Sequence, residues 1–308
     1  MRIVFMGTPS AAVPTLGRIL ADGHEVVAVW TQPDKPAGRG NRLTAPPVKE
    51  FAAANNLTVY QPLKIKFPET LELLQSHRAD AAIVVAYGRI LPETLLDTPR
   101  LGCINNHFSL LPKYRGAAPV NWAIVQGETQ TGVTTMKMNA GLDTGDILLQ
   151  RETEIGETET APELLARLSE IGADLISETL QNLETIEPRP QNELEATFAP
   201  IMKREDGLIT WELNAADICQ RIRGFQPFPN AFAYLGDHKL ILWRAVAEPL
   251  NAPLEAGTII KAQGDDLLVS CGENTILRLI EVQPEGKRRM TVRDFLNGTK
   301  LQVGGKFV

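Results

Sequence analysis

Short, nearly continuous apolar runs alternate with amphipathic stretches over the first part of the chain. The runs at 2–7, 26–32 and 81–88 are typical of strands that are buried on both faces of a parallel sheet. Between them, residues 11–23 and 48–56 have the apolar spacing of helices. This alternation predicts an α/β fold with a doubly wound, Rossmann-like sheet. The turn after the first run reads GTPSAA and lacks the GxGxxG pattern, which disfavours a nicotinamide-dependent enzyme.

A long helix and a connector are expected next. Thr160 is a good N-cap, Pro162 lies in the first turn and Glu163 completes a capping box, so we expect a helix from 161 to 183. Residues 188–204 contain three prolines and little apolar periodicity. This composition is typical of a linker.

The rest of the chain has the pattern of a small β domain. Residues 207–225 suggest a strand and a short helix. Five short strand-like runs follow, separated by Gly, Asp and Asn, at 231–236, 239–246, 257–264, 266–272 and 275–283. Their spacing fits an OB-like β-barrel, a fold that often holds nucleic acid, and it equally allows a generic β-sandwich.

Length and composition are those of a two-domain protein. The chain has 308 residues, of which 44% are hydrophobic, which is enough to build two cores. We expect an α/β domain over 1–187, a linker over 188–204 and an OB-like domain over 205–308. No apolar run approaches the length of a membrane span, and no basic start precedes a long apolar stretch. We therefore expect a cytoplasmic protein with no membrane partner.

Cysteine and histidine usage argues against a metal centre. Cys103, Cys219 and Cys271 are far apart in the sequence and have no paired spacing, and the chain has only four histidines. Zinc sites and disulfide frameworks need closer or paired ligands. We expect no bound metal.

The net charge of −6 at first sight speaks against a nucleic-acid partner. The charge is uneven, however, since residues 200–308 carry 14 Lys and Arg against 13 Asp and Glu. Any contact with RNA must therefore depend on local basic patches. Two candidates are Lys35, Arg39 and Arg42 in an early loop and the run 287–289 near the end; the second is equally well explained as a solvated surface cluster.

The candidate chemistry centres on an amide and an imidazole two residues apart. If 103–107 is a strand, Asn105 and His107 share one face, where one can donate to an oxyanion and the other can handle a proton. Asp143 lies between Gly141 and Gly145, in a loop from which its carboxylate could orient the imidazole. Taken alone, a single histidine is more often a satisfied core residue, and Asp beside Gly is more often a turn former.

Three motifs in order carry a family resemblance. Asn105-Asn106-His107, Ser109-Leu110-Leu111-Pro112 and Leu142-Asp143-Thr144-Gly145 resemble the formyl-transfer site of the folate-dependent formyltransferases, and specifically of the family that formylates methionyl-tRNA. The loop at 31–49 and the stretch at 221–232 are also similar to this family. A glycinamide ribonucleotide formyltransferase has a similar core but lacks this loop and the C-terminal domain.

The resemblance implies a set of residue roles. Asn105, His107 and Asp143 would be the catalytic residues. The folate slot for 10-formyltetrahydrofolate would be lined by Tyr87, Gly88, Arg89, Ile90, Leu91, Ser109, Leu110, Leu111 and Pro112. The charged initiator methionyl-tRNA would meet Lys35, Arg39 and Arg42, with a monomeric enzyme transferring formyl to its free α-amine.

Other functions stay open from the sequence alone. A sugar-nucleotide N-formyltransferase shares the core and a barrel-like second domain, but should not carry the loop at 31–49. A formyl-folate hydrolase would use the same three catalytic residues with water as acceptor. A non-catalytic RNA-binding protein would explain the basic loop and the barrel, but not the combination of Asn105, His107 and Asp143.

Overall fold

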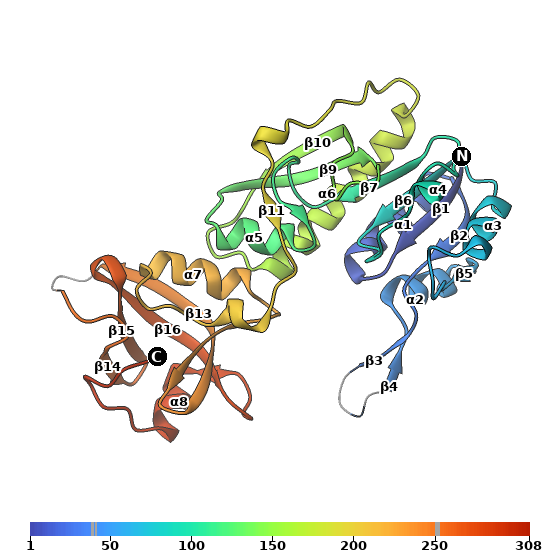
Figure 1. Cartoon of the computed structure of the whole chain (residues 1–308). Coiled ribbons are helices and arrows are strands. Elements are labelled where there is room, and N and C mark those ends of the chain that lie inside the picture. Colours follow the sequence, from blue (N-terminus) through green and yellow to red (C-terminus); the bar gives the residue numbers. More distant parts are fainter. Residues whose placement is uncertain (38–39, 41, 250–252) are drawn as a thin grey trace. The chain divides into compact units, whose positions relative to one another are not determined.

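The computed structural model describes residues 1–37, 40, 42–249 and 253–308. Arg39, one of the predicted tRNA-binding residues, lies outside the described residues. The chain divides into two compact units. Unit 1 comprises Met1–Pro119, Gln130–Glu154 and Leu165–Ala199, and unit 2 comprises Val120–Thr129, Ile155–Leu164 and Pro200–Val308. Figure 1 shows the course of the chain through both.

Unit 1 is built around a mixed sheet with the strand order β10-β9-β7-β6-β1-β2-β5. The strands β1, β2, β5, β6 and β7 pair in parallel, whereas β9 and β10 are antiparallel. Their bounds are β1 Arg2–Gly7, β2 Glu25–Trp30, β5 Val59–Tyr60, β6 Ala81–Val85, β7 Cys103–His107, β9 Gln130–Lys137 and β10 Asp146–Glu154. The three predicted parallel strands are therefore confirmed.

The third predicted strand is shorter than its apolar run. β6 ends at Val85 and not at residue 88. Ala86 and Gly88 have φ of 45° and 77°, and this left-handed backbone is incompatible with an extended strand. The chain turns at this point and carries the segment 86–92 away from the sheet.

Helices lie on both faces of this sheet, as the doubly wound pattern predicts. Their bounds are η1 Ser10–Ala12, α1 Val13–Ala21, α2 Pro47–Ala54, α3 Pro68–Ser76, α4 Glu93–Leu96 and α6 Ala161–Asn182, whereas α5 Pro119–Val125 belongs almost wholly to unit 2. On one face, Leu74 of α3 and Leu95 of α4 pack with Val4 and Val84. On the other face, Asn106 of β7 donates to Thr15 of α1. The predicted long helix is α6, confirmed to within one residue.

The predicted N-terminal cap of α6 is formed by the carboxylate of Glu163. Glu163 Oε2 accepts hydrogen bonds from the backbone N–H of Thr160 at 2.9 Å and from its hydroxyl at 2.7 Å. These two bonds hold the pKa of Glu163 below its usual range. The carboxylate also offsets the positive end of the helix dipole.

Unit 2 contains an antiparallel sheet with the order β12-β13-β16-β15-β14, with β17 paired to β16. Its elements are β12 Ala231–Leu235, β13 His238–Pro249, β14 Ile259–Gln263, β15 Asp266–Cys271, β16 Thr275–Pro284, β17 Met290–Thr291, η3 Arg204–Gly207, η4 Gly272–Asn274, α7 Ala215–Gly224 and α8 Val292–Gly298. All five predicted strands and the helix after residue 213 are confirmed.

The chain end lies between the two edge strands of this sheet. Val308 exchanges two backbone hydrogen bonds with Tyr234 of β12, at 2.7 and 2.9 Å. Ile259 of β14 donates to the Gly305 carbonyl at 2.8 Å. The tail thus occupies the edges that β12 and β14 would otherwise expose. The specific resemblance to an OB fold stays a prediction.

The strand predicted at the start of 207–225 is wrong. Leu208 makes one isolated bridge with Phe232, and the backbone then turns so that Leu213 donates to the Thr210 carbonyl. The alternating apolar residues Ile209 and Trp211 are buried in the core of unit 2. Apolar and polar residues alternate here because these two side chains are buried, although the backbone does not form the hydrogen-bond ladder of a strand.

Two small pairs of strands complete the described chain. β3 Lys35–Ala37 and β4 Arg42–Thr44 form a hairpin, and β8 Arg115–Gly116 pairs in parallel with β11 Phe198–Ala199. A short helix, η2 Glu193–Glu195, lies just before β11. Over the described residues, every helix is too short or too polar to traverse a lipid bilayer.

Candidate functional site

Strand β7 places the Asn-x-His pair in the middle of the sheet. It runs between β6 and β9, with Asn105 opposite Val84 and Met136, and His107 opposite Thr134. Because successive side chains alternate, Asn105 and His107 share a face and Asn106 points to the other. The side chains of Asn105 and His107 are almost buried, with exposed fractions of 8% and 6%.

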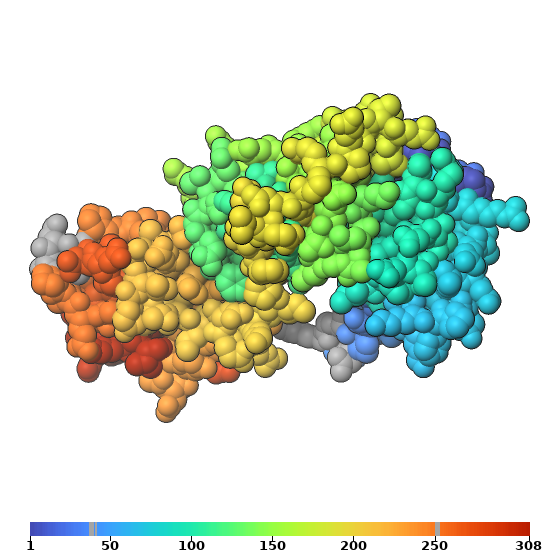
Figure 2. All heavy atoms as spheres, turned by 45° about the horizontal axis from the view of Figure 1, so that its top comes forward, coloured from blue at the N-terminus to red at the C-terminus, as the bar shows by residue number. Residues whose placement is uncertain are grey.

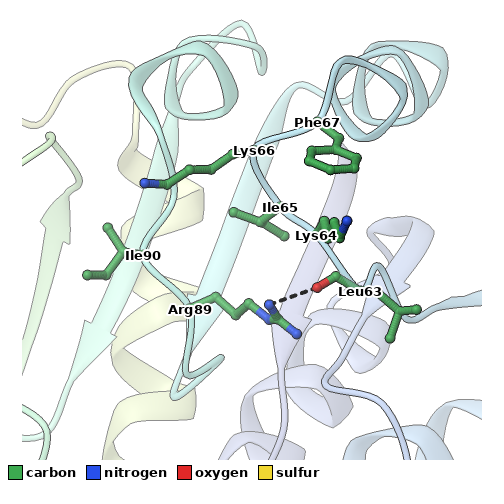
Figure 3. A pocket seen from close by; sticks show the side chains of 7 residues that line it. All are labelled: Leu63, Lys64, Ile65, Lys66, Phe67, Arg89 and Ile90. Atoms are coloured by element: carbon green, nitrogen blue, oxygen red, sulfur yellow. Dashed lines mark hydrogen bonds between the residues drawn. The ribbon is translucent and has the colours of Figure 1, made fainter.

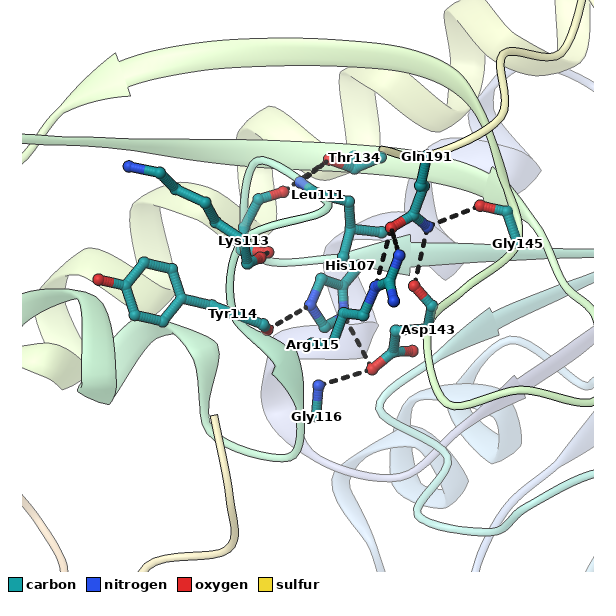
Figure 4. Close-up of polar contacts among 11 residues, drawn as sticks. His107, Leu111, Lys113, Tyr114, Arg115, Gly116, Thr134, Asp143, Gly145 and Gln191 are labelled. Carbon is teal, nitrogen blue, oxygen red and sulfur yellow. Dashed lines mark hydrogen bonds and ion pairs between the residues drawn. The ribbon is translucent and has the colours of Figure 1, made fainter. Parts of the chain in front are cut away.

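His107 is held between two groups (Figure 4). Its Nε2 lies 3.0 Å from the carbonyl oxygen of Tyr114. A carbonyl oxygen can only accept, so this nitrogen carries the proton of the bond. The other ring nitrogen, Nδ1, faces Oδ2 of Asp143 at 3.8 Å. That distance suits an ion pair with a protonated imidazole but is too long for a hydrogen bond.

Asp143 lies in a tightly constrained loop. Its φ is 52°, a left-handed value that Asp tolerates better than most residues. Its Oδ2 accepts a hydrogen bond of 2.8 Å from the backbone N–H of Gly116. At Gly116 a Cβ would lie 2.6 Å from the Ala199 carbonyl oxygen, and at Gly145 one would lie 1.9 Å from that of Lys137. Only glycine allows the chain to pass so closely at either position.

Asn105 has spare hydrogen-bonding capacity. Among the described residues, no hydrogen bond to its side chain is formed, although that side chain is nearly buried. The amide can therefore donate to an oxygen atom of a bound ligand.

The predicted loop 109–112 is fixed to the sheet. Thr134 on β9 donates its hydroxyl to the Ser109 carbonyl at 2.6 Å and accepts from the Leu111 N–H at 3.1 Å. Gln150 on β10 donates to the Leu111 carbonyl at 2.9 Å. The Leu111–Pro112 peptide bond is cis. The Leu111 side chain is buried against the sheet, whereas Leu110 is half-buried.

The predicted folate segment 86–92 has side chains in two environments. Tyr87 and Leu91 are buried in a core cluster of unit 1. Burial raises the pKa of Tyr87 to about 12, and its hydroxyl has no partner among the described residues. Ile90, in contrast, is 77% exposed. Along the chain, Gly88 and Arg89 lie between the buried Tyr87 and the exposed Ile90.

Arg89 and Ile90 border a surface hollow of about 480 Å³ (Figure 3). Arg89 Nη1 donates to the Leu63 carbonyl at 3.0 Å across it. The rest of the lining comes from 63–67, where the Lys64 ammonium lies 4.4 Å from the centre of the Phe67 ring. Sequence reasoning missed this stretch; the signal was the alternation of basic and apolar residues in LKIKF. The hollow combines cations with an apolar lining.

The basic loop forms the β3–β4 hairpin, with Lys35 on one strand and Arg42 on the other. A polar network holds its base. Lys49 Nζ contacts both carboxylate oxygens of Asp34 at 2.8 Å and the Gln61 amide oxygen at 3.0 Å. These contacts hold the pKa of Asp34 below its usual range. Sequence reasoning missed this brace, since its members are far apart in the chain.

The second basic cluster, 287–289, is partly neutralised. Arg289 forms an ion pair with Glu281, and its guanidinium lies 4.8 Å from the centre of the Trp243 ring. Its charge is therefore less available to a partner than that of an isolated arginine.

No metal-binding arrangement occurs in the part of the chain that the structure describes. There, no group of three or more His, Cys, Asp and Glu side chains comes close enough to hold an ion. The three cysteines are unpaired, and burial raises the pKa of Cys103 to about 12.

Comparison with known protein families gives two matches in chain order. Residues 1–180 match the formyl transferase family, and residues 201–300 match the formyl transferase C-terminal domain. The two matches together span most of the chain.

Curated relatives match over nearly the full length. A methionyl-tRNA formyltransferase of Koribacter versatilis is 52% identical and covers 99% of this chain and 98% of its own length. One of Acidobacterium capsulatum is 51% identical, with 98% of this chain and 97% of its own covered.

Solved structures share the fold at low identity. The sugar 3N-formyl transferase WlaRD has a TM-score of 0.67 at 17% identity and covers 94% of this chain and 99% of its own. HypX from Aquifex aeolicus, in complex with tetrahydrofolic acid, has a TM-score of 0.65 at 17% identity and covers 96% of this chain and 47% of its own. At such identities the likeness establishes the fold alone. By its domain matches and its full-length relatives, the chain belongs to the formyl transferase family and, within it, to the methionyl-tRNA formyltransferases.

Proposed function

We propose that this protein transfers the formyl group of 10-formyltetrahydrofolate to the free α-amine of charged initiator methionyl-tRNA, yielding N-formylmethionyl-tRNA for translation initiation. The observation that carries the proposal is His107, held by the Tyr114 carbonyl on one nitrogen and facing Asp143 with the other. The full-length relatives that bear this activity in their names support the same assignment.

In the reaction, the amine nitrogen adds to the formyl carbon, and the carbonyl electron pair moves to oxygen. Asn105 and protonated His107 lie on one face of β7, and both can donate to that oxyanion. Since Nε2 of His107 already donates to Tyr114, the Nδ1–H is the donor available to the reacting centre. Preorganised donors of this kind supply much of the catalysis in acyl transfer.

Collapse of the tetrahedral centre breaks the bond between the formyl carbon and N10 of the folate. The departing nitrogen takes up one proton, and the amine nitrogen loses one. The Asp143 carboxylate lies 3.8 Å from Nδ1, where it can pair with an imidazolium and relay the amine proton through water. Protons therefore balance without a metal or a redox partner.

The hollow beside Arg89 and Ile90 supports binding of the folate. A folate has an apolar aromatic body and a carboxylate tail. The hollow offers the matching chemistry, with Lys64, Lys66 and Arg89 next to apolar side chains. Arginine and lysine bind carboxylates through charge-assisted hydrogen bonds. The segments 86–92 and 109–112 are proposed to hold the pterin end.

The β3–β4 hairpin is proposed to contact the acceptor end of the tRNA. Both Lys35 and Arg42 are exposed at the described part of the hairpin. The network of Lys49, Asp34 and Gln61 sets the direction in which the hairpin leaves the sheet. A braced hairpin presents its cations with little loss of conformational entropy.

The test is an acceptor competition. The enzyme is given 10-formyltetrahydrofolate with charged initiator methionyl-tRNA, a dTDP-amino sugar, glycinamide ribonucleotide or water alone, and formyl transfer is measured for each. We expect transfer to methionyl-tRNA with kcat/KM at least about 100-fold above the others, since the alternatives lose the contacts of the hairpin. Preferential transfer to the amino sugar would overturn the proposal and indicate a sugar-nucleotide N-formyltransferase.

A further inference from the structure

We propose that residues 189–199, here termed the clamp segment, position both partners of His107, with Gln191 as the main positioning residue. The proposal rests on the proposed function and extends the site beyond its three predicted residues. The segment belongs to the stretch that the sequence predicts to be a plain linker. Figure 2 shows it, in yellow, lying on the surface of the green residues that carry the site loops.

Gln191 makes four hydrogen bonds, which is all that its amide geometry usually allows. Its Nε2 donates to the carbonyl oxygens of Asp143 at 2.8 Å and Gly145 at 2.7 Å. Its Oε1 accepts from Nε and Nη2 of Arg115 at 3.0 and 2.8 Å. Carbonyls only accept and a guanidinium only donates, so the orientation of the amide is settled. One side chain thus ties the catalytic loop to β8 (Figure 4).

Arg115 is the anchor of this arrangement. Its side chain is only 2% exposed, so its charge needs close partners. Both guanidinium ends pair with the Glu193 carboxylate at 2.8 Å. The hydrogen bond from Arg115 holds the pKa of Glu193 below its usual range, so this carboxylate stays ionised. The clamp segment therefore supplies two partners of Arg115, the Glu193 carboxylate as its counterion and the Gln191 amide oxygen as a further acceptor.

Thr197 holds the other partner of His107. Its Oγ1 accepts from the Tyr114 N–H at 2.9 Å, and its carbonyl accepts from the Arg115 N–H at 2.9 Å. Tyr114 has a φ of 60°, a costly backbone conformation for an aromatic residue. That conformation aims the Tyr114 carbonyl at Nε2 of His107. The Thr197 contacts make the conformation persist.

The two ends of the segment are also fixed by backbone pairing. Arg189 and Ile147 exchange two hydrogen bonds, at 2.8 and 2.9 Å. Ala199 accepts from Ala117 at 2.9 Å in the β8–β11 pair. The segment thus spans the loop of Asp143 and the loop of Tyr114. Each loop touches His107 from a different side, so the clamp sets the distance and angle between the imidazole and both groups.

Gln191→Glu is the informative variant. A glutamate at this position keeps the size and can still accept from Arg115, but it cannot donate to the two carbonyls. We expect kcat for methionyl-tRNA to fall about 10- to 100-fold, since displacements of about 1 Å at a catalytic group cost that much. KM for both substrates should change less than about 2-fold, because no substrate contact is removed. The pH profile of kcat should also shift, because Asp143 moves relative to His107.

Thr197→Val is the second variant, since valine keeps the shape and removes the acceptor of the Tyr114 N–H. It should lower kcat with the same small change in KM. Leu194→Ser is the matched control, because Leu194 lies in the segment with 95% of its surface exposed. It should keep the wild-type kcat. Urea unfolding of every variant separates misfolding from misplacement.

The outcomes are distinct. A Gln191→Glu enzyme with wild-type kcat and pH profile overturns the clamp while leaving the proposed function intact. If kcat falls equally in Gln191→Glu and Leu194→Ser, the clamp is also overturned, because the effect then comes from any change in the segment and not from the Gln191 contacts. If the wild-type enzyme itself fails to formylate methionyl-tRNA, the proposed function fails, independently of the variants.

Discussion

His107 donates Nε2–H to the carbonyl oxygen of Tyr114 across 3.0 Å, which leaves Nδ1 as the nitrogen that faces the carboxylate of Asp143. The contact determines the neutral tautomer, with the proton on Nε2 and the lone pair on Nδ1. Protonation then adds a proton at Nδ1, close to Asp143. The sequence predicts an imidazole near a carboxylate, and the structure shows that Nδ1 faces the Asp143 carboxylate and Nε2 the Tyr114 carbonyl.

Asn105→Ala should lower kcat about 100- to 1,000-fold, the usual cost of removing one oxyanion donor. The KM values for folate and methionyl-tRNA should stay nearly unchanged, because this donor acts mainly on the developing charge. Steady-state kinetics with both substrates measure the split. Asn106→Ala is no suitable control, since Asn106 donates to Thr15 in the core; Asn182→Ala, at the exposed end of α6, serves better. Wild-type turnover in Asn105→Ala would exclude the role.

Asp143→Asn should lower kcat by at least about 100-fold, as expected for loss of a proton-handling group. The variant isolates the charge, because asparagine tolerates the left-handed φ of 52° and can still accept from the Gly116 N–H. Its unfolding midpoint in urea should therefore match that of wild type. A variant with normal kcat would show that the carboxylate charge does not act on His107.

Arg42→Ala should weaken the use of methionyl-tRNA and reduce the slope of log(kcat/KM) against log[salt] by about one unit, the share of one phosphate contact. KM for the folate should stay unchanged. The control is Arg100→Ala, which removes another exposed cation of unit 1. An equal effect in both variants would indicate general electrostatic attraction in place of a contact by the hairpin.

His77 should make the stability of the protein sensitive to mild acid. It is buried, and Trp30 donates its indole N–H to His77 Nε2 at 3.2 Å, a bond that requires the neutral ring. Burial lowers the pKa of His77 below its usual value of 6.5. The unfolded state therefore binds the proton more readily, so stability is complete above about pH 6.5 and declines as the pH falls below it.

The measurement is urea unfolding at pH 7.5 and pH 5.5 for wild type and His77→Gln. Over the one pH unit below its usual pKa, this histidine lowers the free energy of unfolding by at most about 1.4 kcal/mol. His77→Gln should lose less stability than wild type between the two pH values. His238→Gln, at the exposed first residue of β13, should behave as wild type. Identical pH dependence in all three would contradict the prediction.

Much of the fold follows from local pattern. The strands at β1, β2, β6 and β12 to β16 and the helix α6 are predictable because buried strands and amphipathic helices leave recognisable patterns of apolar residues. The exception at 207–213 shows the limit of that rule. Ile209 and Trp211 alternate with polar residues because the core of unit 2 takes them in, with a single bridge to a neighbouring strand.

The sequence alone predicts which residues form the candidate site: a strand with period two places Asn105 and His107 on one face, and Asp143 follows in a glycine-flanked loop. How these residues are held in place depends on the tertiary structure. The Tyr114 carbonyl and the Gln191 amide reach it through hydrogen bonds between segments remote in sequence. Such contacts leave no periodic signal, because they depend on where the chain returns and not on which residues are neighbours along it.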